Sequence, residues 1–408
     1  MPRPGITIDT MGEQSNQELS AFAAATRAWL AKNFPPSLAF KNPVPFQNDA
    51  PYAESHPDFL LWRARMADKG WGAPDWAPEY GGAGLDAAQM GILAEEMARI
   101  GAFNPMRNAG YTMLGPTLLE YGTDAQKARH LPPIARGETR WCQGFSEPGA
   151  GSDLAALQTR CLDDGDHWVV TGQKIWTSSA NHADWCFALV RTDMSRKHAG
   201  IGFLLIDMRS PGVSTRPLIL ISGANHFCEL FFDDVRVPKG NMVGQPDQGW
   251  AIAKHLLQHE RDSLSEGRGG GPDLVAIARQ YVGVDGDGHI ADADLRARMI
   301  ANAMRAQAFN LAVVMAAEET KAGHPANLVP ALKNIGADVA QTRAELMIEI
   351  MGNQGLGWTG DAFSQIERDA TRQWLHSRAF SIYGGSQEIQ NNIIAKRVLG
   401  LPDAPGSR

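Results

Sequence analysis

The spacing of hydrophobic residues changes twice along this 408-residue chain, and this change constrains the fold more than any other feature. From residue 16 to about 136, apolar residues recur at intervals of three and four, which predicts amphipathic helices. Residues 141–243 instead hold short apolar runs separated by turn residues, which predicts strands. From Gly249 the helical spacing returns. The order predicts an α+β fold, mostly helical, with a helical part before and after a β domain.

The changes in spacing give three predicted domains, at residues 1–140, 141–248 and 249–408. Asp86 is a predicted N-cap for a helix that ends at Ile100. The other predicted helices cover residues 54–69, 108–121, 124–136, 249–265, 293–322, 324–351, 361–380 and 386–398. The glycine-rich insertion 267–290 is expected to interrupt the C-terminal helices. Gly81–Gly84 is glycine-rich but follows no strand, so we do not expect a dinucleotide-binding βαβ fold.

The composition is that of an ordinary globular protein, with 44% hydrophobic and 20% charged residues. A net charge of −7 without a run of Lys or Arg argues against nucleic acid as the main partner. None of the four cysteines form a C-x-x-C pair, which indicates buried thiols in a reducing compartment. We see no secretory signal and no apolar run near the ~20 residues of a membrane helix. The predicted location is the cytoplasm, with no membrane contact.

Two segments of the β domain carry the chemistry expected at a cofactor site. The first, residues 143–153 (QGFSEPGAGSD), is rich in small and hydroxyl residues. Its Gly149 and Gly151 allow the main chain to approach a bound group and expose N–H donors. The second, residues 172–178 (GQKIWTS), places the flat apolar face of Trp176 beside hydroxyl groups. Together these groups suit a planar, polar, phosphate-bearing cofactor.

These two segments, the helix–β–helix order and the closing motifs 383–390 (YGGSQEIQ) and 397–400 (RVLG) resemble the acyl-CoA dehydrogenase family. The resemblance runs from about residue 55 to 402. It implies a middle β-barrel domain, a C-terminal four-helix bundle and the cofactor FAD. It also implies α,β-dehydrogenation of an acyl-CoA thioester to the trans-2-enoyl-CoA, with electrons passed to an electron-transfer flavoprotein.

The resemblance also implies which residues hold the flavin and the substrate. Phe145 and Ser146 would touch the isoalloxazine ring, and Trp176 would pack on it. The other cofactor contacts implied in the β domain are Gln143, Gly151, Ser152, Thr177 and Ser178. The implied substrate contacts are Ser152, Arg261, Tyr383 and Gly384.

The reaction needs a carboxylate to remove the α-proton of the thioester. Many family members place this Glu directly after the Tyr of the closing motif, where this chain has Gly384. Other members place it on the first C-terminal helix, one residue before an Arg, and Glu260–Arg261 match that placement. We therefore predict Glu260 as the catalytic base. The alternative for Glu260 is an ordinary ion-paired residue on a helix surface.

The second half of the implied FAD site lies in the C-terminal domain, in part contributed by a second subunit. The residues that match it are Glu349, Gly352, Gly355, Ser386 and Glu388. The family's Arg-x-x-Phe-Gly motif is missing, and Arg268 or Arg279 would have to replace its Arg. His255 and His259 have the i, i+4 spacing of metal ligands but no third ligand, so no metal is predicted.

A homodimer or homotetramer is predicted, and the missing Arg motif leaves a heteromeric assembly open. Two other functions are open. The first alternative is that the chain has the same fold but uses O₂ as the oxidant, as an acyl-CoA oxidase or a flavin monooxygenase. The second alternative is that the chain is a non-catalytic partner subunit of a heterotetrameric acyl-CoA dehydrogenase. Since Gly384 and Gly385 carry no side chains, the preferred acyl group is expected to be α-branched, cyclic or otherwise bulky.

Overall fold

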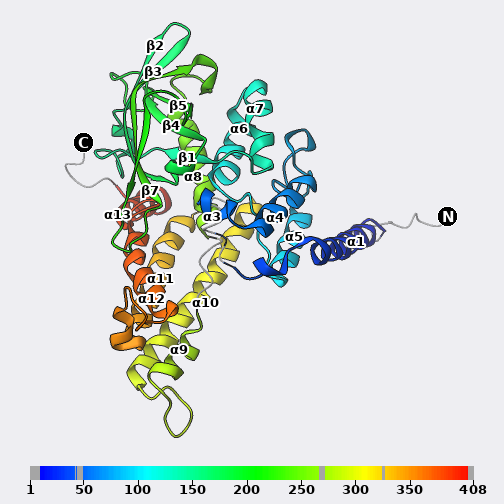
Figure 1. The fold of residues 1–408 in the computed structure, drawn as a ribbon, viewed down its shortest axis with the longest axis vertical. Helices are drawn as coiled ribbons and strands as arrows, with labels where there is room; N and C mark the ends of the chain where they lie inside the picture. Colours follow the sequence, from blue (N-terminus) through cyan, green and yellow to red (C-terminus); the bar gives the residue numbers. More distant parts are fainter. Residues whose placement is uncertain (1–9, 42, 44–48, 266–271, 324–326, 403–408) are drawn as a thin grey trace, which may run out of the picture. The chain divides into compact units, whose positions relative to one another are not determined.

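The computed structural model describes residues 10–41, 43, 49–265, 272–323 and 327–402 (Figure 1). The chain divides into two compact units, each described here by itself. One unit holds residues 1–218 and 226–259, and the other holds residues 219–225 and 260–408. The predicted mostly helical α+β fold is confirmed, with a mixed sheet in the middle of the chain. The predicted three-domain boundaries stay a prediction.

Side-chain caps set the starts of several helices in the first unit. Asp86 and Gln89 form a reciprocal capping box, since Oδ1 of Asp86 accepts the Gln89 N–H at 2.9 Å and Oε1 of Gln89 accepts the Asp86 N–H at 3.1 Å. The predicted cap and helix are therefore confirmed. Trp62 lies at the centre of the core, fully buried, and its Nε1 donates to the Phe103 carbonyl at 2.8 Å. The helices are α1 (Thr10–Asn33), α3 (Ala50–Glu54), α4 (Pro57–Asp68), α5 (Ala87–Arg99), α6 (Gly115–Tyr121) and α7 (Asp124–Ala135).

The β domain of the first unit is one eight-stranded mixed sheet. Its strands are β1 (Trp141–Gly144), β2 (Arg160–Asp164), β3 (His167–Ser178), β4 (Trp185–Arg191), β5 (Ile201–Asp207), β6 (Val213–Leu218), β7 (Phe227–Pro238) and β8 (Met242–Val243). The hydrogen-bonded order is β6-β7-β3-β2-β4-β5-β8, and β1 pairs in parallel with β4. The segment 172–178 is the last part of β3, which pairs along its length with β7 in antiparallel register.

The sheet and the helices of the first unit share one apolar core. Phe187 on β4 and Phe203 on β5 are fully buried and stack with their ring centroids 6.0 Å apart. Helix α8 (Gly249–Ser265), as predicted, follows the sheet, and its Ile252 and Leu256 join the same cluster. This packing makes the sheet a rigid support for the loops at its edges.

The second unit is helical. Its helices are α9 (Leu274–Tyr281), α10 (Ala293–Lys321), α11 (Val329–Met351), α12 (Gln365–Ser377) and α13 (Gln387–Ile393). Helix α9 lies inside the insertion 267–290, which was expected to interrupt the C-terminal helices, so part of this insertion is itself helical. The apolar residues Leu274 and Ile277 of α9 are buried against Leu346 and Ile350 of α11, which explains why a short helix forms between glycine-rich segments.

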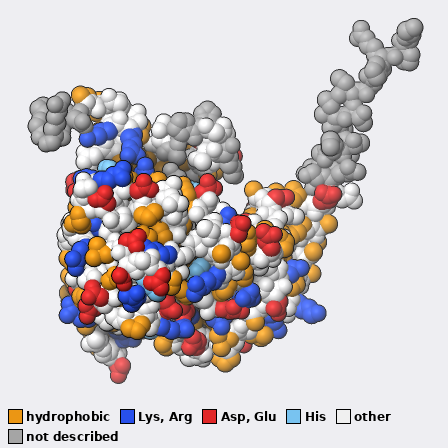
Figure 2. Space-filling view, turned by 90° about the horizontal axis from the view of Figure 1, so that it is seen from above, with side chains coloured by type: hydrophobic (Ala, Val, Ile, Leu, Met, Phe, Trp, Pro, Cys, Tyr) orange, Lys and Arg blue, Asp and Glu red, His pale blue; other side chains and the backbone are white. Residues whose placement is uncertain are grey.

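Acidic and basic side chains are interspersed on the face drawn in Figure 2, with hydrophobic side chains between them. Such mixing agrees with the modest net charge of −7. In the parts of the chain that the structure describes, no helix is long and apolar enough to cross a membrane.

Candidate functional site

The glycine-rich segment 143–153 ends strand β1 at Gly144 and then forms a loop that is closed at its base by the side chain of Glu147. Oε2 of Glu147 accepts the N–H of Gln158 at 2.6 Å, and Oε1 accepts the N–H of Thr159 at 2.9 Å. The main chains of Glu147 and Ala150 exchange two hydrogen bonds of 3.0 Å. The chain between these anchors is thereby held as a tight projection, with its ends fixed on the sheet.

The tip of this loop is open to solvent. Pro148, Gly149, Gly151, Ser152 and Asp153 are all exposed. A Cβ atom added at Gly149 or Gly151 would meet no other atom within 4 Å. Internal packing therefore does not require glycine at these two positions. What glycine provides there is an unobstructed main chain, which suits the close approach of a ligand.

Lys174 on β3 joins the loop to the second segment. Its side chain is fully buried, and Nζ lies 2.7 Å from Oε1 of Glu147 and 3.2 Å from the Phe145 carbonyl oxygen. The next residue, Ile175, donates its N–H to the carbonyl of Ser146 at 2.9 Å. The two segments that the sequence singled out are therefore in direct contact.

The charges of this pair shift the pKa of each partner. Burial lowers the pKa of the Lys174 ammonium, and the charge and hydrogen bond of Glu147 oppose that effect. Burial alone would raise the pKa of Glu147, but the charge and hydrogen bonds of Lys174, with those from Thr159 and Gln158, hold it below its usual value. Glu147 is therefore a carboxylate at neutral pH, and its two oxygens accept the hydrogen bonds from Gln158, Thr159 and Lys174.

Arg191 fixes the far end of the same loop. This guanidinium is buried and donates to the carbonyls of Ala155 at 2.6 Å and Leu157 at 3.1 Å. It also donates to the carbonyls of Arg196 at 3.0 Å and Lys197 at 2.7 Å. Buried cations satisfied in this way orient the main chain around them. The loop is thus anchored by charged groups at both ends.

Trp176 stands out in β3 for its backbone and its exposure. Ile175 and Trp176 together oppose the single residue Glu229 on β7, which makes a β-bulge between Lys174 and Thr177. Trp176 has φ of +60°, a left-handed conformation rare for a bulky residue, and its side chain is 54% exposed. The indole meets Phe227 edge-on with the ring centroids 6.1 Å apart. A strained bulge that presents a large aromatic face to solvent indicates a functional surface.

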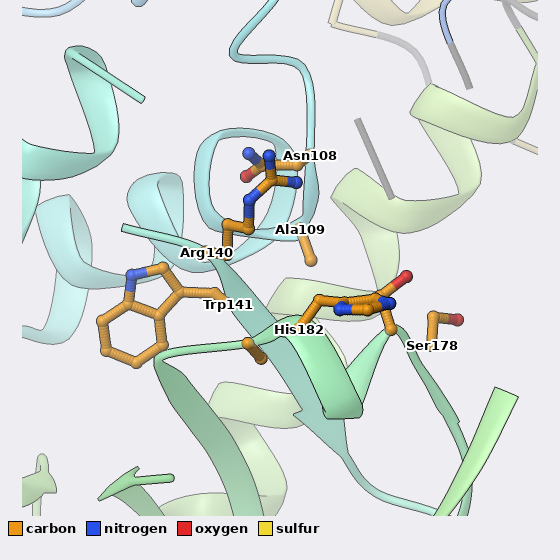
Figure 3. A pocket seen from close by; sticks show the side chains of 8 residues that line it. Asn108, Ala109, Arg140, Trp141, Ser178 and His182 are labelled. Carbon is orange, nitrogen blue, oxygen red and sulfur yellow. The ribbon is translucent and has the colours of Figure 1, made fainter. Parts of the chain in front are cut away.

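The hydroxyl residues after Trp176 differ in exposure. Thr177 is fully buried, and its Oγ1 has no hydrogen-bond partner among the described residues. Ser178 is exposed and lines a pocket with residues of the helical part of the same unit (Figure 3). In this view the His182 ring extends toward Ser178, and Arg140 extends toward Asn108. The full lining is Asn108, Ala109, Arg140, Trp141, Ser178, Ser179, His182 and Ala183.

The cofactor contacts predicted in segment 143–153 differ in how far they are buried. Ser152 is at the exposed tip, and Gln143 and Ser146 are half-buried. Phe145 is in the core, where its ring packs edge-on against Phe187 and Phe203 at about the usual aromatic distance. Its ring is therefore held away from the surface.

In the second unit, Glu349 is tied to an arginine. It receives two hydrogen bonds from Arg298, one of them 2.6 Å long between Nη1 and Oε2, and the Arg298 hydrogen bonds hold its pKa below the usual value. Asp294 accepts from the same guanidinium at 2.8 Å. Gly352 ends α11 with φ of +55°. A Cβ at Gly355 would lie 2.7 Å from the Ile348 carbonyl oxygen, so only glycine fits there.

The closing motif begins the last helix. Ser386 is the N-cap of α13 and accepts the Ile389 N–H at 3.4 Å, and Glu388 lies in the first turn. Tyr383 is half-buried and packs edge-on against Phe380 with centroids 5.9 Å apart. Gly384 has φ of +65°.

The backbone of Glu260 and Arg261 lies in α8, as predicted, but the side chains of both residues are outside the described part of the structure. Arg268 and the side chain of His259 are also outside it. Arg279 is exposed on α9. His255 packs edge-on against Tyr121, with ring centroids 5.3 Å apart, which is a packing role.

Comparison with known proteins decides the family. The acyl-CoA dehydrogenase N-terminal domain model matches residues 16–138, the middle domain model residues 142–235, and the C-terminal domain model residues 247–399. The acyl-CoA dehydrogenase IpdE1 of Mycobacterium tuberculosis is 38% identical over 95% of this chain and 98% of its own length. The chain belongs to the acyl-CoA dehydrogenase family. It is therefore an oxidoreductase acting on acyl-CoA, as the sequence resemblance implied.

Two solved structures are similar over nearly the whole chain. The Tcur3481-Tcur3483 steroid ACAD is 26% identical with a TM-score of 0.74 and covers 95% of this chain and 98% of its own. The ChsE4-ChsE5 complex from Mycobacterium tuberculosis is 28% identical with a TM-score of 0.73, covering 99% and 100%. Homologues in the acyl-CoA dehydrogenase family are flavoproteins.

Sequence reasoning about this acyl-CoA dehydrogenase missed Glu147, Lys174 and Arg191. A Lys or Arg among strand residues is normally assigned to a solvated face. One signal was available for Lys174, because it shares the inward positions of β3 with Trp168 and Val170, which are buried.

Proposed function

We propose that this chain binds FAD and catalyses the α,β-dehydrogenation of an acyl-CoA thioester to the trans-2-enoyl-CoA. The observation that carries the proposal is the contact between the exposed loop tip and the strand of Trp176. These two surfaces belong to one unit and are joined through Lys174, Glu147 and the Ile175–Ser146 hydrogen bond. Family membership supplies the reaction class.

The residues present fit a flavin. The accessible main chain at Gly149 and Gly151 offers N–H donors, and the exposed indole of Trp176 offers an aromatic face. Gln143, Ser146, Gly151, Ser152 and Ser178 would hold the cofactor in the first unit. When bound, FAD would accept the hydride that leaves the β-carbon.

Among the residues of the second unit, Gly352 and Gly355 of a second subunit, together with Ser386 and Glu388, would hold the other part of the cofactor. Glu349 would act beside the two glycines as an Arg298-paired carboxylate. Ser386 caps α13, whose first-turn N–H groups and dipole favour a nearby anionic group. Arg268, or Arg279, which is exposed on α9, would take the place of the missing family Arg.

Glu260 would remove the α-proton, with Arg261 beside it, and Ser152, Tyr383 and Gly384 would contact the substrate. A carboxylate at the start of the reaction must be ionised, and one enclosed by apolar groups has a raised affinity for the proton it receives. The proposal includes transfer of the electrons to an electron-transfer flavoprotein.

A bulky, ring-containing acyl group fits this proposal best. Gly384 and Gly385 carry no side chains, and Gly384 stands where many family members are expected to have the catalytic Glu. The similar Tcur3481-Tcur3483 protein is named a steroid ACAD. We also propose an oligomer, because the two solved relatives are named as pairs of proteins, ChsE4-ChsE5 and Tcur3481-Tcur3483.

Anaerobic titration of the FAD-reconstituted protein with straight, branched and cyclic acyl-CoA thioesters tests this proposal. Bleaching of the visible flavin band, strongest with a cyclic acyl group, is expected. Equal or better bleaching by straight short-chain thioesters would overturn the assignment of a bulky substrate. In a separate assay in air, peroxide formation without a dye acceptor would assign O₂ as the oxidant. A chain that takes up no flavin would indicate a partner subunit.

A further inference from the structure

The Glu147–Lys174 ion pair is buried within the first unit, with 7% of the Glu147 side chain and none of the Lys174 side chain exposed. Removing two charges from water is costly, and well-packed apolar residues of similar size often serve stability equally well or better. A stability role alone is therefore a weak explanation for this pair. The hydrogen bonds that the pair makes to the loop give a better explanation.

The hydrogen bonds of the pair end on the main chain of the loop. Lys174 donates to the carbonyl of Phe145, just before the loop. Glu147 accepts from Gln158 and Thr159, just after it. The ion pair thus holds both ends of the loop together, and it does so from the strand that carries Trp176 two residues further along.

We infer that Glu147 and Lys174 are a positioning pair, which fixes the loop tip 148–153 relative to Trp176 and Ser178 before the cofactor binds. The inference rests on the proposed function. Neither side chain is exposed enough to touch a ligand, so the pair acts through the main chain that it holds. A site held by locked side chains binds its ligand without first having to order it, and displacements near 1 Å are costly.

The other anchors of the loop limit what loss of the pair would do. Arg191 still holds the carbonyls of Ala155 and Leu157, and the Ile175–Ser146 hydrogen bond still joins loop and strand. The loop of a variant is therefore expected to stay attached to the sheet while its tip loses its fixed position. This separates the inference from a general loss of folding.

The test compares three variants of the full chain: Glu147→Gln, Lys174→Met and the neutral pair Glu147→Gln/Lys174→Met. The matched control is Arg236→Met, which breaks the Arg236–Asp164 ion pair of 2.7 Å in the same sheet, where both side chains are 56% exposed. Amide hydrogen exchange is measured on the FAD-free protein, FAD affinity by titration, and the melting temperature by circular dichroism.

In Glu147→Gln we expect the amides of Gln158 and Thr159 to exchange at least tenfold faster and the FAD dissociation constant to rise at least tenfold. The neutral pair should recover most of the melting temperature lost in Lys174→Met, because no unpaired charge is left buried, but not the FAD affinity. Arg236→Met should change neither exchange nor affinity. If Lys174→Met does not fold, Glu147→Gln and the neutral pair carry the test.

FAD affinity within twofold of wild type in Glu147→Gln, measured below its melting temperature, would overturn the inference and leave the proposed function standing. Recovery of both stability and FAD affinity in the neutral pair would do the same. A wild-type chain that takes up no FAD would overturn the proposed function together with the inference.

Discussion

The side-chain amide of Gln390 donates a hydrogen bond of 3.0 Å to the carbonyl oxygen of Gly384. Gln390 is buried, and Gly384 and Gly385 have φ of +65° and +86°. The turn at which this chain departs from the commonest family pattern is thus held by a buried amide in a left-handed backbone. A residue with a side chain is strained in that conformation.

Replacing Gly384 with alanine should lower the free energy of unfolding by about 1 kcal/mol, since an L-residue is strained at positive φ. The control is Gly91→Ala in the middle of α5, where a Cβ meets nothing within 4 Å. That change should raise the free energy of unfolding by about 1 kcal/mol, since alanine is the better helix former. Urea unfolding of both variants measures whether each change raises or lowers the free energy of unfolding. A higher free energy of unfolding in Gly384→Ala would contradict the left-handed turn described here.

Trp176→Gly should weaken FAD binding at least tenfold while it changes the free energy of unfolding by less than about 1 kcal/mol, because relief of left-handed strain offsets the lost contact with Phe227. Phe40→Gly is the matched control, an exposed aromatic residue with φ of +58° in the same unit. It should leave FAD affinity unchanged. Equal FAD affinity in both variants would remove Trp176 from the flavin site.

His130 makes the stability depend on pH. Burial between Trp141 and Trp185, with a smaller contribution from the charge of Arg129, lowers its pKa from 6.5 to about 4. Between these values the unfolded chain binds a proton that the folded chain does not, so stability should fall as the pH falls from 6.5 to about 4. Below that window, Glu96 contributes a separate loss between pH 4.5 and about 2, because the hydrogen bond from Arg27 depresses its pKa.

His130→Phe keeps an aromatic ring between the two tryptophans and removes the titrating group. Its unfolding midpoint in urea should vary less between pH 7 and pH 4.5 than that of wild type, by an amount corresponding to up to about one proton. Near pH 8, where His130 is uncharged in both the folded and the unfolded chain, the difference in unfolding midpoint between the two proteins should not change with pH. Parallel curves over the whole pH range would show that another group causes the acid sensitivity.

Local signals predicted the elements of this fold well where a cap or a strong period was present. Asp86 and Gln89 specify a helix start by themselves, and α8 follows from its apolar spacing. Helix α9 was missed because its eight residues depend on burial against Leu346 and Ile350 of α11, which lie about seventy positions further along the chain. Strand β6 carries only a weak sequence signal, because three of its six residues, Ser214, Arg216 and Pro217, are exposed, and its pairing with β7 is what defines it.

The contacts that support the candidate site could not be predicted from the sequence. Phe145 was expected at the flavin, but its apolar ring lies in the core formed by β4 and β5. Lys174 and Glu147 are 27 positions apart, and no local pattern shows that the two charges neutralise each other in the interior. Ion pairs between distant residues depend on strand register and loop closure, which cannot be read from a single sequence.

The reduction of the flavin by acyl-CoA without oxygen tests the central claim most directly. Wild-type protein and Glu260→Gln, each reconstituted with FAD, are mixed anaerobically with the best acyl-CoA of the panel while the visible flavin band is followed. We predict full bleaching in wild type, and a rate at least a thousandfold lower in Glu260→Gln with its flavin content unchanged, because the amide cannot take up the α-proton, a contribution of about 10²–10⁴-fold or more for a general base. Bleaching at the wild-type rate in Glu260→Gln, or none in wild type, would contradict the account.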